Sequence, residues 1–239
     1  MRGLIVAFGF LTRLPVPRVA IDAEAQAASL KWYPLVGLTL GVLLVGASAL
    51  LHAMPVLPAA AMLLVAWVAL TGALHLDGLA DSADAWIGGM GDRERTLSIM
   101  KDPRSGPAGV VALVLVLLLK FSALATLANP WLLLLPPLLG RGAVVAWFLT
   151  TRYVRSQGLG EPLRGAPATG CRIAVLLSVI ACLCFGKAGL LALVAAVITG
   201  WVWRRACVAR LGGFTGDTAG ALVELVEATT LVALVALHP

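Results

Sequence analysis

The chain has 239 residues, of which 60% are hydrophobic and only 13% are charged. A soluble domain carries about 25% charged residues, so this composition excludes a water-soluble globule and a disordered chain. The apolar runs are continuous, which excludes a β-barrel with alternating strands. We assign the net charge of +6 to basic cytoplasmic loops of a membrane protein and expect no nucleic-acid partner.

The apolar runs predict one all-α, polytopic transmembrane bundle over residues 1–239, with about seven spans. Residues 1–32 precede the spans and form an expected interfacial segment, because Arg13, Pro15 and Pro17 interrupt a short apolar stretch there. A polar segment, residues 75–107, follows the second span. The predicted spans are Tyr33–Met54, Pro58–Leu74, Ala108–Leu127, Trp131–Thr150, Ile173–Phe185, Gly189–Trp203 and Ala219–Leu237.

Basic residues divide the connections between these spans into two groups. Fifteen Lys and Arg residues lie before the first span and after the second, fourth and sixth spans, whereas the other connections hold only Lys187. The positive-inside rule therefore predicts a cytoplasmic N-terminus and an outer C-terminus. It also makes residues 75–107 a cytoplasmic loop.

The strongest chemical signal is the segment His75–Asp84, which begins that loop. Asp77, Asp81 and Asp84 are spaced i, i+4 and i+7, which places them within an arc of about 60° on one helix face. Three like charges repel one another, and a bound Mg²⁺ would remove that penalty. Gly78 leaves room for a close ligand. The alternative is an acidic, solvated helix.

Further charges follow in the same loop. Lys101, Asp102 and Arg104 lie in a turn shaped by Pro103 and Gly106. Cations beside a carboxylate-bound metal are what phosphoryl transfer requires, since its catalysis is mostly positioning and charge neutralisation. The alternative is that the basic residues only set the topology.

Ionisable residues also occur inside the spans. Arg141, Glu224 and Glu227 are costly in lipid, so they are expected to face a polar cavity or one another. Arg141 either pairs with a glutamate or lines a substrate cavity. The glycine-rich segment 212–220 before the last span could hold an anion, and Asp217 within it is equally plausible as a helix cap.

These motifs together resemble the adenosylcobinamide-GDP ribazoletransferase (cobalamin synthase) family. The matching segments run in order along nearly the whole chain, so chance agreement is improbable. They are Phe10–Pro17, Tyr33–Gly37, His75–Asp84, Ile99–Asp102, Leu139–Arg141 and Gly212–Asp217, followed by Glu224 and Glu227.

The resemblance implies a Mg²⁺-dependent transfer of the phosphocobinamide group from adenosylcobinamide-GDP to α-ribazole or its 5′-phosphate. The products would be adenosylcobalamin or its 5′-phosphate, and GMP. The family motif falls on Asp77, Asp81 and Asp84, which we expect to bind the metal. Asp84 or Asp102 is the expected proton acceptor, and Lys101 would neutralise phosphate charge. The residues expected to contact substrate are His75, Arg104, Arg141, Asp217, Glu224 and Glu227.

Two other functions stay open. A CDP-alcohol-type phosphotransferase would release CMP, whereas an ion-coupled transporter would use Arg141, Glu224 and Glu227 as its pathway. The acidic cluster lies at the cytoplasmic edge and no inverted repeat is visible, which disfavours transport. We expect a multi-pass protein among the lipids of the bacterial inner membrane, with its active site facing the cytoplasm. The sequence leaves a homo-oligomer open.

Overall fold

The computed structural model describes residues 1–156 and 158–236, and these residues form helices with no strand among them. The predicted all-α class is therefore confirmed. The α-helices are α1 (Arg2–Leu11), α2 (Ala23–Ser29), α3 (Tyr33–Leu50), α4 (Val56–Thr71), α5 (Leu74–Gly88), α6 (Arg93–Ile99), α7 (Pro107–Thr126), α8 (Leu135–Thr150), α9 (Ala168–Leu183), α10 (Gly186–Leu211) and α11 (Gly216–Val235). Short 3₁₀ helices are η1 (Leu30–Trp32), η2 (Pro130–Leu134) and η3 (Pro162–Gly165).

Five helical segments of the described residues are long and apolar enough to cross a membrane. They are Ala23–Leu50, Pro107–Thr126, Pro130–Thr150, Gly186–Leu211 and Gly216–Val235. A sixth is obtained if the bent pair α4 and α5 counts as one span. The protein is thus a multi-pass membrane protein, with fewer long spans than the seven predicted.

The lower count has two local causes. Gly72 and Ala73 both adopt left-handed backbone conformations, with φ of 61° and 59°, so the chain turns by 89° between α4 and α5. α9 replaces the predicted span Ile173–Phe185 and has only 16 residues, fewer than the roughly 20 that a full crossing requires. The predicted end of the last span, Leu237, lies outside the described residues.

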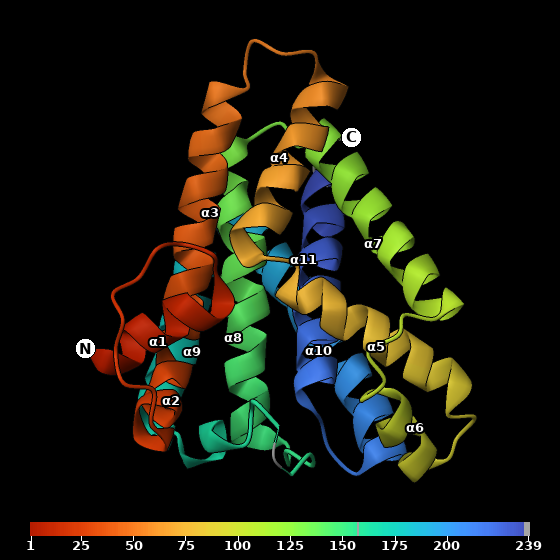
Figure 1. Ribbon diagram of the computed structural model, residues 1–239. Coiled ribbons are helices and arrows are strands. Elements are labelled where there is room, and N and C mark those ends of the chain that lie inside the picture. Colours follow the sequence, from red (N-terminus) through yellow and green to blue (C-terminus); the bar gives the residue numbers. More distant parts are fainter. Residues whose placement is uncertain (157, 237–239) are drawn as a thin grey trace.

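α11 is the central helix of the bundle. It packs against α5, α7, α8 and α10, and most of its side chains are buried. α3 lies against α8, the short α1 lies beside the lower part of α3, and α2 continues through η1 into the lower end of α3 (Figure 1). The N-terminal helix α1 has ten residues, about 15 Å of helix, which is too short to cross a bilayer.

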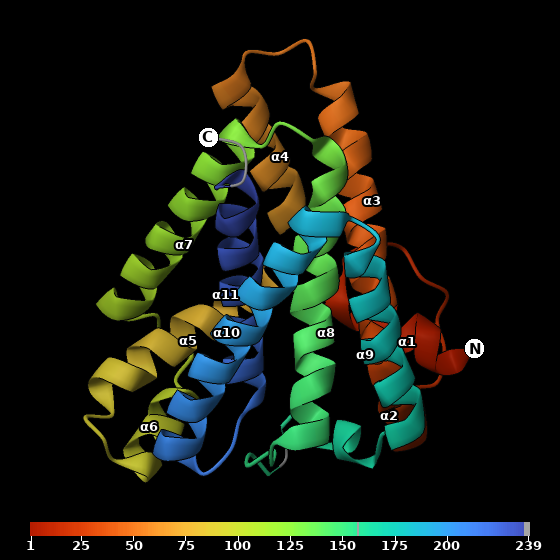
Figure 2. The same ribbon diagram turned by 180° about the vertical axis from the view of Figure 1, so that it is seen from behind.

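The connections rich in charge gather at one end of the bundle. α6, the connection from α8 to α9, and the turn from α10 to α11 all lie at the lower end in Figures 1 and 2. The α3–α4 and α7–α8 connections lie at the opposite end. α5 crosses the bundle near the charged end, so it brings its aspartates to that side.

Candidate active site

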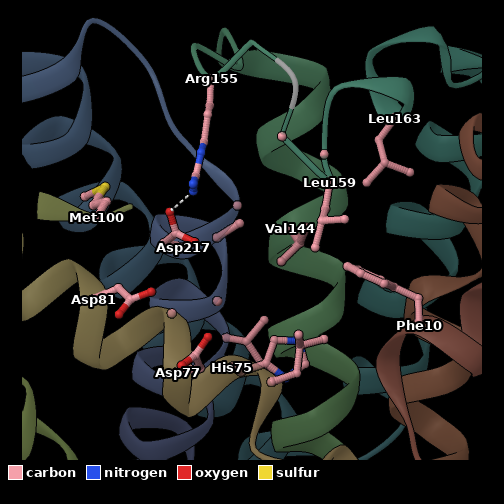
Figure 3. Close-up of a pocket in the computed structure, with 18 of the residues that line it drawn as sticks. Phe10, His75, Asp77, Asp81, Met100, Val144, Arg155, Leu159, Leu163 and Asp217 are labelled. Carbon is pink, nitrogen blue, oxygen red and sulfur yellow. Dashed lines mark hydrogen bonds and ion pairs between the residues drawn. The ribbon is translucent and has the colours of Figure 1, made fainter. Parts of the chain in front are cut away.

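A cavity of about 500 Å³ opens between α5, α8, α11 and the connections at the charged end. Asp77 and Asp81 of α5 line it, together with Asp217 at the start of α11. Figure 3 shows the three carboxylates on one side of the cavity. Within the described residues, the carboxylates of Asp77 and Asp81 make no hydrogen bond or ion pair, so their oxygens are open to a ligand.

The close approach of α5 and α11 builds this side of the cavity. A Cβ atom at Gly78 would lie 2.7 Å from the Asp217 carbonyl oxygen and 3.2 Å from the Gly220 Cα. Gly78 was expected to leave room for a ligand, but the backbone of α11 fills that room. The glycine instead lets two helices bring their carboxylates to one cavity.

Arg155 faces Asp217 across an ion pair of 2.6 Å between Nη1 and Oδ2 (Figure 3). The backbone holds Arg155 there, because the Val154 amide donates to the Phe214 carbonyl at 2.9 Å and the Phe214 amide donates to the Arg152 carbonyl at 2.9 Å. The connection after α8 is thereby tied to the turn before α11. Asp217 is not the helix cap, since that position belongs to Thr215.

Asp84 has different surroundings from the other two aspartates of α5. Its carboxylate accepts hydrogen bonds from the backbone amides of Gly106 at 2.7 Å and Gly109 at 2.8 Å, at the start of α7. It is not among the residues that line the cavity. The predicted helix is present, but Asp84 faces the N-terminus of α7, while Asp77 and Asp81 face the cavity. Its role as a metal ligand stays a prediction.

The turn between α6 and α7 forms another part of the cavity wall. Lys101, Asp102 and Ser105 line the cavity, whereas Arg104 does not. Arg104 donates from Nε and Nη2 to the two carboxylate oxygens of Asp102, at 2.9 and 2.7 Å. This pairing lowers the pKa of Asp102 to about 2, so the carboxylate is ionised at neutral pH.

The ionisable residues of the membrane interior form one buried network. Lys120 Nζ contacts Glu224 Oε2 at 2.6 Å and Glu227 Oε2 at 2.5 Å, and Arg141 pairs with Glu227. Arg141 Nη2 also lies 3.4 Å from His75 Nδ1. Arg141 and His75 line the cavity, but the two glutamates do not. Arg141 therefore pairs with a glutamate and also lines the cavity, and its contact with substrate stays a prediction.

An apolar wall completes the cavity opposite the carboxylates. Phe10, Leu159 and Leu163 lie there, on the other side of Val144 from Asp77 (Figure 3). Buried Tyr153 also contributes, and burial raises the pKa of its phenol. Sequence reasoning missed all of these residues, and Arg155, as site residues. The one signal for Tyr153, Arg155, Leu159 and Leu163 was the concentration of polar and basic residues in the connection after the fourth predicted span, whereas Phe10 appeared only within the segment Phe10–Pro17 that matches the family.

No group of three or more His, Cys, Asp or Glu side chains in the described part of the chain is arranged to enclose a metal ion. Magnesium seldom needs such an enclosure, because it is commonly bound by one or two carboxylates together with water and substrate phosphates. Asp77 and Asp81 supply two carboxylates of that kind. The donor chemistry of the cavity therefore fits a magnesium ion shared with a phosphate-bearing substrate.

The fold and the cavity define a polytopic helical membrane protein whose charged site opens at one end of the bundle. The chain belongs to the cobalamin-5-phosphate synthase family, whose model matches residues 3–235. Among its relatives are adenosylcobinamide-GDP ribazoletransferases of Stutzerimonas stutzeri, 56% identical over 98% of both chains, and of Pseudomonas aeruginosa PAO1, 55% identical over 98% of both chains. No solved structure matches the chain.

Proposed function

We propose that the protein is an adenosylcobinamide-GDP ribazoletransferase of cobalamin biosynthesis. It would transfer the phosphocobinamide group from adenosylcobinamide-GDP to α-ribazole or its 5′-phosphate. Family membership and full-length similarity to ribazoletransferases support this activity. The observation in the structure that supports it best is the cavity lined by Asp77 and Asp81, whose carboxylates have no partner in the described residues, together with Lys101 and Arg155.

In the proposed reaction, a ribose hydroxyl of α-ribazole attacks the phosphorus nearer the corrinoid. A new P–O bond forms to that oxygen, the P–O bond to GMP breaks, and the hydroxyl proton passes to a carboxylate. Asp102 is the better placed of the two predicted acceptors, since it lines the cavity and Asp84 does not. Its pairing with Arg104 keeps the carboxylate ionised, so it carries no proton when the hydroxyl arrives.

Asp77 and Asp81 would hold Mg²⁺, which neutralises charge on the phosphates when bound. Asp84 would act mainly by fixing the start of α7. Lys101 and Arg141 would approach the phosphate oxygens from the cavity wall. Glu224 and Glu227 would act on substrate only indirectly, because their carboxylates are bound to Lys120 and Arg141.

The corrinoid is much larger than a cavity of about 500 Å³, so only the phosphate end of the donor would enter. The corrinoid would then rest at the mouth of the cavity, where Phe10 and Leu159 offer an apolar surface. We further propose that the protein lies in the bacterial inner membrane with this mouth toward the cytoplasm. The gathering of basic connections at the same end supports that orientation.

Neither alternative function gains support. The relatives are named for a GDP-linked donor, which disfavours a CDP-alcohol-type phosphotransferase. The intramembrane charges are buried and paired with one another, whereas a transport pathway needs charges that an ion can reach.

The decisive experiment incubates the purified protein with adenosylcobinamide-GDP, α-ribazole and graded Mg²⁺, and measures release of GMP and formation of the cobalamin product. Asp77→Asn and Asp81→Asn should each lower turnover by about 100-fold or more and raise the Mg²⁺ requirement. Asp92→Asn is the matched control, because Asp92 caps α6 outside the cavity. Rates near that of the unmodified protein in both cavity variants would refute the metal assignment.

A further inference from the structure

A second cavity, of about 420 Å³, lies beside the candidate active site and is lined by four arginines from three segments of the chain. These are Arg93, Arg152, Arg155 and Arg164. We call it the arginine cavity. Tyr153 and Arg155 line both this cavity and the candidate active site, so they form the wall between the two.

Two of the arginines are fixed in place by the fold. Arg93 Nε donates to the Leu211 carbonyl at 2.8 Å, and Arg155 is held by Asp217. The side chains of Arg152 and Arg164 are exposed and make no hydrogen bond or ion pair within the described residues. They are therefore available to a ligand at the rim of the cavity.

The charge of the arginine cavity is not explained by topology alone. The positive-inside rule requires basic residues on one side of the membrane, but it does not require four of them to converge on one hollow. Two carboxylates offset part of this charge, since Glu161 also lines the cavity and Asp217 is paired with Arg155. The four arginines therefore still give the cavity a net positive charge. Such a concentration of guanidinium groups attracts phosphate, which arginine binds through two parallel hydrogen bonds.

We propose that the arginine cavity binds the nucleoside monophosphate part of the donor, which leaves as GMP; this inference rests on the proposed function. A GDP-linked donor has two phosphoryl groups in series. One would lie by Asp77 and Asp81, and the other would pass Arg155 toward the arginine cavity. The cavity volume is within the range of about 300–1,000 Å³ typical of small-molecule sites. The phosphoryl group beside the aspartates would rely on Mg²⁺ for charge neutralisation, whereas the arginines would stabilise the departing GMP dianion directly.

The test measures binding of GMP, guanosine and inorganic phosphate to the full-length protein in detergent by calorimetry. The double variant Arg152→Gln and Arg164→Gln should weaken GMP binding by about tenfold or more. The control double variant Arg172→Gln and Arg205→Gln removes the same charge from exposed positions outside both cavities and should bind GMP normally. Guanosine should bind far more weakly than GMP to the unmodified protein.

Several results would overturn the inference: no GMP binding by the unmodified protein, unchanged binding in the first double variant, or equal loss in both double variants. Equal competition by inorganic phosphate, or by phosphatidylglycerol in nanodiscs, would identify a general phosphate or lipid headgroup site instead. Restored binding by Arg152→Lys and Arg164→Lys would exclude misfolding as the cause. The titration needs no corrinoid, so absence of turnover with adenosylcobinamide-GDP would refute the proposed function separately.

Discussion

Asp84→Asn separates a structural role of this aspartate from a role in metal binding. The carboxylate accepts two backbone hydrogen bonds, of 2.7 and 2.8 Å, at the N-terminus of α7. An asparagine keeps one acceptor oxygen and turns an NH₂ group toward the other amide. One charge-assisted hydrogen bond, worth about 1.5–3 kcal/mol, is then lost, together with about 0.3–1 kcal/mol of charge–helix interaction. We expect the free energy of unfolding to fall by about 2–4 kcal/mol.

The assay is thermal or denaturant unfolding in detergent without Mg²⁺, followed by turnover at graded Mg²⁺. Asp81→Asn is the matched comparison, because it removes a charge from the same helix face without a backbone partner in the described residues. Asp84→Asn should lower the free energy of unfolding and leave the Mg²⁺ concentration for half-maximal rate almost unchanged. Asp81→Asn should leave the free energy of unfolding almost unchanged and raise that Mg²⁺ concentration. Unchanged stability with a raised Mg²⁺ requirement in Asp84→Asn would refute the structural role.

Two further substitutions test the packing that positions the site. Glu227→Gln leaves Lys120 and Arg141 with one buried carboxylate, so the free energy of unfolding in detergent should fall by about 3–5 kcal/mol. The control, Glu94→Gln on the exposed face of α6, should have little effect. Gly78→Ala places a methyl group 2.7 Å from the Asp217 carbonyl and should cost about 1–3 kcal/mol in unfolding experiments and slow turnover. Normal stability and rate in Gly78→Ala would contradict the close contact of α5 and α11.

The helices could be predicted well because apolar composition and periodicity determine them directly. Residues 107–126 and 216–235 are single helices close to their predicted spans. The sharp bend at Gly72 and Ala73 was not predicted, since nothing in an apolar run ending in Thr-Gly-Ala requires a turn of 89°. Tertiary packing of α5 across the bundle decides that bend.

The site was only partly predictable for a related reason. The spacing of Asp77, Asp81 and Asp84 correctly predicted a helix, but a shared face on one helix does not specify which neighbour each side chain meets. α7 begins beside Asp84, while the cavity opens beside Asp77 and Asp81. Arg155 and Tyr153 were not predicted as site residues, because their placement depends on a backbone pairing with residue 214, about sixty positions away.

The buried charge network connects membrane packing to the chemistry of the cavity. The network joins three helices, with Lys120 from α7, Arg141 from α8, and Glu224 and Glu227 from α11. Because its two cations balance its two carboxylates, it can lie out of water without an uncompensated charge. Arg141 also lines the cavity and lies beside His75. A bound phosphate would therefore compete with Glu227 for Arg141. Because Lys120 contacts both glutamates, the ion pairs between α7 and α11 would persist if a substrate phosphate took Arg141 from Glu227.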